Sequence, residues 1–299
     1  MEWLKDASAG QWIVESTTGE FGGTIPNLLP QGFEAYVRVF HPMARSATGD
    51  ESWEPVTWAD AAADFGTPMG PIVQSAHVLG REDPWACDAV TSSSGWTYER
   101  PGDLTNLPAV VRVLADHTTT STGVAAIWEG WGGLVSSQGR MAFLFAAPGG
   151  GFEGAITRAA LTIRSAYQRV RSRFAFREAR PGTGVLPADV ATGPKLELPG
   201  RAYFLARLDL ADLCADDWEQ RAIWADPPFV RTPSLLWPDD HAWCLATEID
   251  FDSTLIGGTA ELAAALTAAP GLEAMEIDRN ASLMWGSATP PGTTCGVGL

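Results

Sequence analysis

The stretch of this sequence best suited to chemistry contains three carboxylates at every second position. They are Glu248, Asp250 and Asp252, within residues 236–258. Strand side chains alternate between two faces, so these three are predicted to share one face at intervals of about 7 Å. Clustered carboxylate oxygens suit Mg²⁺ or Ca²⁺, which makes the trio a candidate metal site. The alternative is a solvent-exposed strand face with Asp252 or Ser253 starting a turn, because neighbours on one strand diverge unless another element closes over them.

The same residues resemble a motif of phosphoryl-transfer enzymes. Asp250-Phe-Asp-Ser-Thr-Leu255 is similar to the first motif of haloacid-dehalogenase-type phosphatases, Asp-x-Asp-x-Thr-Leu. The resemblance covers six residues and implies that Asp250 is a nucleophile, Asp252 a general acid/base, and Mg²⁺ the ion that offsets phosphate charge. The chain departs from that family afterwards, since only residues 253–299 follow and they contain no lysine. A coincidental match is therefore the favoured interpretation.

A glycine-rich run offers a second motif. Gly149, Gly151 and Gly154 match the G-x-G-x-x-G pattern, after the apolar run 141–147 and before a helical pattern. This context is typical of dinucleotide binding, in which glycines let the backbone approach a pyrophosphate. However, Pro148 interrupts the turn and no further βαβ units follow. A simple linker is the alternative.

An arginine-rich helix is predicted directly after this run. Apolar residues recur every three or four positions from Phe152 to Phe174, as in an amphipathic helix. Its remaining positions carry many arginines, of which Arg164, Arg169, Arg171 and Arg173 are the candidate partner-binding residues. They could bind an anionic partner such as RNA, an acidic protein or phosphate. Docking on the acidic remainder of the same chain explains them equally well.

Other residue types lack the spacing that chemistry requires. No pair of histidines has metal-ligand spacing, and no two of the four cysteines are close in sequence. His241, beside Asp239 and Asp240, is predicted to be a hydrogen-bonded structural residue. The thirteen tryptophans are spread along the chain, as core residues are, which does not favour carbohydrate binding.

Composition limits the classes of partner. The 299-residue chain carries a formal net charge of −16 and is 45% hydrophobic. Nucleic-acid phosphates need neutralising cations, so nucleic-acid binding is expected at most through the arginine-rich helix. A basic protein is the more compatible partner. No apolar run approaches the roughly 20 residues of a membrane span. Residues 1–6 lack the pattern of a signal peptide, and a cytoplasmic location is expected.

The helices and strands predicted along the chain, which must position these residues, indicate an α+β fold. Its sheets are expected to be mainly antiparallel, with an arginine-rich helical insertion. Strands are predicted at 32–41, 123–129, 141–147, 201–208, 243–252 and 275–277. Helices are predicted after an N-cap at Thr57, after Asn106, within 216–224 and at 260–269. The predicted division is an N-terminal lobe (1–148), a glycine-rich loop, helix and connector (149–200) and a C-terminal lobe (201–299), with one continuous domain as the alternative.

Four phrases of the sequence resemble a family of hypothetical proteins from actinobacteria. They lie at residues 32–42, 124–132, 198–203 and 237–258, spread from end to end of the chain, and together contain 48 of its 299 residues. The resemblance implies an actinobacterial source and a cytosolic location, with no activity attached. The arginine-rich helix lies outside the pattern, which suggests an insertion into a shared α+β core.

The charge balance and the lack of a complete catalytic set predict a non-enzymatic cytosolic protein that binds another macromolecule. The predicted partner is a protein that contacts an acidic surface. No cofactor is expected, although Mg²⁺ or Ca²⁺ would fit the carboxylates. The alternative is a Mg²⁺-dependent enzyme of phosphate esters or nucleotides that uses Asp250 and Asp252.

Overall fold

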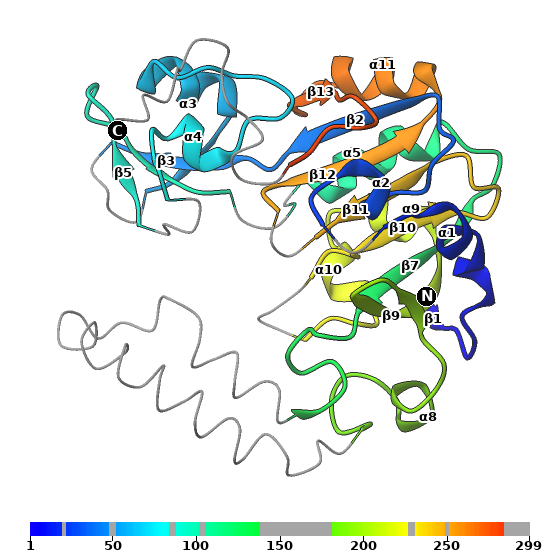
Figure 1. The fold of residues 1–299 in the computed structure, drawn as a ribbon. Coiled ribbons are helices and arrows are strands. Elements are labelled where there is room, and N and C mark those ends of the chain that lie inside the picture. The colour runs from blue at the N-terminus through cyan, green and yellow to red at the C-terminus, as the bar shows by residue number, and fades with distance from the viewer. Residues whose placement is uncertain are drawn as a thin grey trace, which may run out of the picture.

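A computed structural model describes residues 1–19, 22–47, 52–83, 88–101, 104, 106–137, 181–226, 231–248 and 251–283. Figure 1 shows a large sheet flanked by helices and a smaller α+β unit beside it. Every strand pair among the described residues is antiparallel. The predicted α+β class with mainly antiparallel sheets is therefore confirmed. None of the helices in these ranges is long and apolar enough to cross a membrane.

The large sheet has nine strands in the described ranges. Its order is β1-β9-β7-β10-β11-β12-β2-β13, and β8 also pairs with β9. The strands are β1 (Glu2–Trp3), β2 (Ala35–Phe40), β7 (Thr122–Trp128), β8 (Leu196–Leu198), β9 (Arg201–Asp209), β10 (Leu235–Pro238), β11 (Cys244–Thr247), β12 (Ser253–Gly258) and β13 (Ala274–Glu276). Strands from the predicted lobes 1–148 and 201–299 are thus interleaved in one sheet.

The alternation of side chains along these strands separates two cores. On one face, residues such as Val39, Ile127 and Leu245 pack against α5 (Leu107–Ala115), α9 (Leu210–Cys214), α10 (Trp218–Arg221) and α11 (Ala260–Ala268). On the other face, residues such as Tyr36 and Ala246 pack against α1 (Gln11–Ser16) and α2 (Ile25–Leu28). Both faces are covered, which explains why most residues of the central strands are buried.

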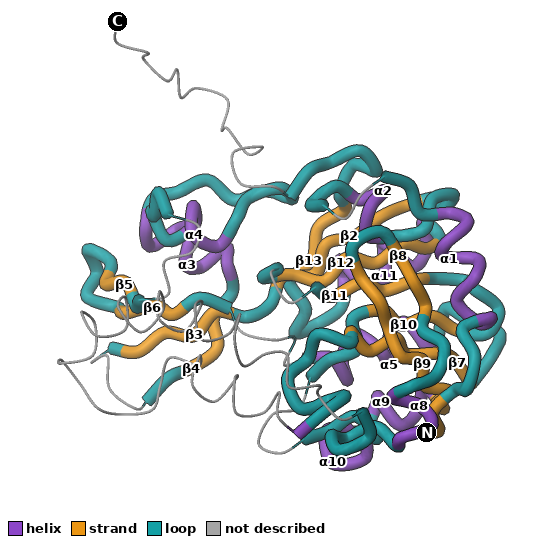
Figure 2. The backbone as a smooth tube through the Cα atoms, turned by 60° about the horizontal axis from the view of Figure 1, so that its bottom comes forward, coloured by secondary structure: helices purple, strands orange, loops and turns teal. Residues whose placement is uncertain are grey.

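The smaller unit has its own core. Its sheet has the order β4-β3-β6-β5, built from β3 (Met43–Ser46), β4 (Glu54–Val56), β5 (Val90–Thr91) and β6 (Thr97–Glu99). Two helices, α3 (Trp58–Phe65) and α4 (Ser75–Val78), pack with this sheet around Trp58 and Tyr98. Figure 2 shows the unit to one side of the large sheet, joined to it where β2 leads into β3. The remaining short helices are a 3-10 turn (Ser8–Gly10) and α8 (Ala188–Ala191).

Capping and helix-breaking residues in the sequence correctly predicted where several helices begin or end. Thr57 caps α3 by accepting a hydrogen bond from the Asp60 amide, and Gly66 ends the helix with a positive φ of 67°. The helix after Asn106 and the helix before Pro270 also lie where they were predicted. In each case the signal is a cap or a breaker within one turn of the helix end.

The predicted strand at 243–252 was wrong in its second half. Strand β11 ends at Thr247, and β12 begins at Ser253 and pairs back on β11, with Thr247 opposite Thr254. The Phe251 amide donates to the Glu248 carbonyl oxygen across 3.0 Å, which reverses the chain. The physical reason is that Asp residues favour turns, and Asp252 lies directly before β12, where the chain has reversed.

Candidate functional site

Two of the three predicted carboxylates lie at the ends of central strands of the large sheet, Glu248 directly after β11 and Asp252 directly before β12. Glu248 and Asp252 are 4% and 7% exposed, so the predicted solvent-exposed face is wrong for both. Asp250 lies outside the described residues. In the part of the chain that the structure describes, no group of three histidines, cysteines or carboxylates is arranged to hold a metal ion.

Asp252 is held by a buried arginine. The Arg38 Nη2 atom lies 3.0 Å from Asp252 Oδ1, and the Ser75 amide donates to Oδ2 across 3.0 Å. Arg38 also donates to the Ser253 hydroxyl and to the carbonyl oxygens of Pro71 and Val73. Burial lowers the pKa of the Arg38 guanidinium, and the charge of Asp252 opposes that shift. Both oxygens of this carboxylate therefore have partners within the chain.

Glu248 belongs to a second buried pair. One of its carboxylate oxygens accepts a hydrogen bond of 2.9 Å from the Tyr203 hydroxyl, and the other lies 3.2 Å from Arg201 Nη1. Burial, together with the charge of Glu248, raises the pKa of Tyr203. The Arg201 guanidinium lies over the ring of Trp128, 4.6 Å from its centroid. The arrangement positions Glu248 to balance a buried cation.

A hydrogen-bonded chain of one histidine and two threonines lies at the same end of these strands. His41 Nε2 lies 2.9 Å from Thr254 Oγ1, which lies 2.6 Å from Thr247 Oγ1. All three residues are buried, and the His41 carbonyl oxygen accepts from the Trp58 indole. These contacts join β2, β11 and β12 to the smaller unit. Their burial suits a structural role, because a substrate has no access to these atoms.

The other predicted motifs lie outside the described residues. This applies to Gly149, Gly151 and Gly154, to Arg164, Arg169, Arg171 and Arg173, and to the predicted strand at 141–147. Nucleotide binding through the glycine run and partner binding through the arginines stay predictions.

His241 is described, and its ring stacks on Trp12 with a centroid distance of 4.3 Å. Burial lowers its pKa, although Asp239 and Asp240 oppose that shift. His241 is exposed and has a positive φ of 56°, the left-handed conformation that non-glycine residues adopt less often. Its setting is a turn supported by an aromatic stack, in line with the structural role expected for it.

An acidic surface lies at the end of the sheet where β9 leads into α9. Helix α9 packs between α5 and α10, and the three helices bring together six carboxylates with two arginines, Arg112 and Arg221. We call this set the acidic surface: Asp116, Asp209, Asp212, Asp216, Asp217 and Glu219. Asp212 is half-buried and the other five are exposed. The sequence indicated part of it as an acidic helix at 216–224.

Ion pairs within the acidic surface involve two arginines and the N-terminal ammonium of Met1, which lies 3.8 Å from Asp212. Arg112 lies 2.6 Å from Asp216, and Arg221 lies 3.1 Å from Asp217 and 3.8 Å from Asp212. Solvent screens such pairs, and each contributes about 0–1 kcal/mol to stability. Six carboxylates against two guanidinium groups and one ammonium group leave the surface negative.

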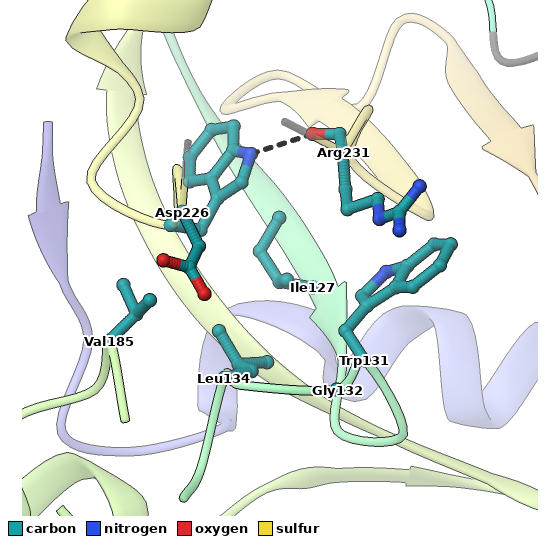
Figure 3. A pocket seen from close by; sticks show the side chains of 8 residues that line it. Ile127, Trp131, Gly132, Leu134, Val185, Asp226 and Arg231 are labelled. Atoms are coloured by element: carbon teal, nitrogen blue, oxygen red, sulfur yellow. Dashed lines mark hydrogen bonds between the residues drawn. The ribbon is translucent and has the colours of Figure 1, made fainter. Parts of the chain in front are cut away.

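A hollow opens beside the same helices. It is lined by Ile127, Trp131, Gly132, Leu134, Val185, Trp224, Asp226 and Arg231. Figure 3 shows Ile127 and Leu134 between Asp226 on one side and the stacked Trp131 and Arg231 on the other. The Arg231 guanidinium lies 4.5 Å from the centroid of the Trp131 ring, and its carbonyl oxygen accepts from the Trp224 indole across 2.9 Å. Sequence reasoning missed this hollow, since its residues come from segments about 100 positions apart.

No protein-family model, curated protein or solved structure matches this chain. The resemblance to actinobacterial proteins therefore stays a prediction.

Proposed function

We propose that the protein binds a basic protein partner through the acidic surface, without catalysis. The observation that carries the proposal is the local excess of exposed carboxylates on three helices packed side by side. Like charges held close together on a rigid support create a field that attracts a cationic surface and raises its rate of association. The support is rigid because α5 and α9 bury Leu107, Leu114 and Leu213 in the core of the large sheet.

The exposed carboxylates are not required for folding in this proposal. Asp216 and Asp217 have side chains that are 91% and 52% exposed, and their ion pairs with arginine are screened by water. Replacing them with amides is therefore expected to change the charge of the acidic surface and leave the fold intact. A loss of binding in such a variant would then report the loss of charge and not a loss of folding.

The enzymatic alternative, with Asp250 and Asp252 acting on a phosphate ester, has weaker support. Both oxygens of Asp252 already accept hydrogen bonds in a buried setting. A general acid/base must exchange protons with a substrate within hydrogen-bonding reach. Asp252 would have to leave its ion pair with Arg38 before it could do so.

The test uses the full chain as bait for proteins that bind it at two salt concentrations. At about 0.1 M salt the Debye length is ~10 Å, and at about 1 M it falls to ~3 Å. We expect a basic protein to be captured at the lower concentration and released at the higher one. The variant Asp216→Asn/Asp217→Asn/Glu219→Gln should lose this capture, since it removes three charges from the acidic surface.

The control variant is Glu197→Gln/Glu261→Gln/Glu276→Gln, which removes three exposed charges from β8, α11 and β13. It has the same net charge as the first variant, so capture should persist if position matters and not total charge. The proposal is wrong if no salt-sensitive partner is captured, or if the two variants lose capture equally.

A further inference from the structure

The smaller unit meets the large sheet through the first residues of its two helices. The carboxylate of Glu273, directly before β13, accepts hydrogen bonds from the Trp58 and Ala59 amides across 2.6 Å and 2.8 Å. These are the first two amides of α3, which have no partner within the helix. At α4, the Asp252 carboxylate accepts from the Ser75 amide in the same way. Carboxylates of the large sheet thus hold both helices by their positive ends.

Other groups of the large sheet add to this junction. Arg38 in β2 donates to the carbonyl oxygens of Pro71 and Val73 across 3.0 Å and 2.6 Å. The His41 carbonyl oxygen, directly after β2, accepts from the Trp58 indole across 2.7 Å. Hydrogen bonds weaken steeply when the distance or the angle changes. These contacts are therefore expected to form together when the unit is docked and to break together when it moves away.

The core of the smaller unit is completed by side chains of the large sheet. Phe40, the last residue of β2, is buried in this core, with its ring centroid 4.8 Å from that of Trp58. Met275 of β13 packs against the same core. The strands of the unit span only two to four residues each. Small cores and short strands give low local stability, and domains of roughly 60 residues are marginally stable by themselves.

We propose that the smaller unit is a docked module, ordered only while Glu273, Asp252 and Arg38 hold it, which opens as one unit while the large sheet stays folded. The chain permits this, because the unit is inserted between β2 and α5, entered through residues 41–42 and left after Glu99. The large sheet has two cores of its own, whose buried residues lie outside residues 43–99. Its strands can therefore stay packed when the module opens. This property does not depend on the acidic surface, which lies on α5, α9 and α10.

Hydrogen exchange measured by mass spectrometry tests the proposal on the full chain, in a series of urea concentrations below the global unfolding transition. We expect the amides of α3, β3 and β6 to exchange through one common opening. Its urea dependence should be weaker than that of the central strands β7, β9 and β10, because a smaller opening exposes less surface. The proposal is wrong if the module exchanges only together with these central strands, or if its elements open separately.

Glu273→Gln weakens the junction without removing side-chain volume. Its amide group presents a donor in place of one of the two oxygens that accept from α3. We expect exchange throughout the module to become about tenfold faster, while the central strands keep their rates. Glu34→Gln is the matched control, because the Glu34 carboxylate accepts from the Ala260 amide at the first residue of α11, across 3.1 Å. It should speed exchange at the start of α11 and leave the module unchanged.

Three results with these variants would overturn the proposal. One is an effect of Glu273→Gln that is confined to the first turn of α3, which would indicate fraying of that helix alone. The second is unchanged exchange of the module in Glu273→Gln. The third is equal acceleration of the module by both variants, which would indicate a general loss of stability. If Glu273→Gln does not fold, the urea series on the wild type still decides between one common opening and none.

Discussion

Arg38 and Asp252 are 214 positions apart in the sequence, yet their side chains meet at 3.0 Å in the interior of the protein. The pair lies where the large sheet joins the smaller unit. Arg38 reaches from β2 to the carbonyl oxygens of Pro71 and Val73, and Asp252 accepts from the first residue of α4. A residue that resembled part of a phosphatase motif is thus a structural clamp between two parts of the fold.

The first prediction concerns this clamp. Asp252→Asn or Arg38→Met leaves one buried charge without its counterion, which typically costs about 3–5 kcal/mol. We expect either change to lower the free energy of unfolding by that amount, measured by urea titration. The double variant should lose less than the sum of the two, because the second change removes the charge that the first one left unpaired. Single-variant losses below about 1 kcal/mol would contradict the assignment of Arg38 and Asp252 as a buried clamp.

The second prediction concerns divalent ions. A ligand that binds only the folded state raises the melting temperature by mass action. Because both oxygens of Asp252 are engaged within the chain, we expect neither Mg²⁺ nor Ca²⁺ to raise the melting temperature. Scanning calorimetry with and without each ion measures this. An increase that disappears in Asp250→Asn would instead support the enzymatic alternative.

The third prediction concerns stability in acid. Burial would raise the pKa of Asp240, but hydrogen bonds from Thr119, Thr118 and Ala242 outweigh it and lower the pKa to about 2. The folded-state pKa is below its ordinary value of 3.8, so the carboxylate stabilises the fold above about pH 4 and loses this effect as the pH falls toward 2. Asp240→Asn should therefore be less stable than the wild type at neutral pH.

Urea unfolding at a series of pH values tests the third prediction. The two stability curves should converge between about pH 4 and pH 2. Asp240 is exposed, so solvent screening limits the difference at neutral pH to about 1 kcal/mol or less. Parallel curves across this range would show that the hydrogen bonds to Asp240 do not stabilise the folded state.

The fourth prediction concerns a close approach of two strands. A Cβ atom at Gly123, in β7, would lie 2.4 Å from the backbone oxygen of Trp237 in β10. Because backbone cannot move aside as a side chain can, Gly123→Ala should separate these strands and cost about 1–3 kcal/mol. Gly70→Ala is the control, since no heavy atom lies within 4 Å of its added Cβ. Equal melting temperatures of the two variants would contradict the β7–β10 register.

Local patterns in the sequence were sufficient for the elements and for the fold class. Alternation at 243–247 correctly assigned Leu245 and Ala246 to opposite faces of the sheet, where they enter different cores. Thr57 and Gly66 correctly marked the ends of α3. These signals succeed because a cap or an alternating pattern acts between residues a few positions apart, whatever the rest of the chain does.

The roles of Glu248 and Asp252 depend on the tertiary structure. A strand pattern looks the same whether its acids face solvent or a buried arginine, so the sequence could not reveal that Glu248 meets Arg201 and Asp252 meets Arg38. The sequence did predict a turn starting at Asp252 or Ser253, as the alternative to a carboxylate site. Strand register across the large sheet sets these partners, and register depends on contacts between segments that are far apart in sequence.

The same distinction applies to the proposed interface. The sequence alone determined the net charge of −16 and the acidic run Asp216, Asp217 and Glu219, because charge and composition need no fold. The helix predicted there at 216–224 is shorter in the structure, at α10 (Trp218–Arg221). Only the packing of α5, α9 and α10 gathered their carboxylates into one surface, and only the folded chain placed Trp131 beside Trp224 and Arg231. The physical reason is that a surface or a hollow is a property of packed elements and has no counterpart in a linear pattern.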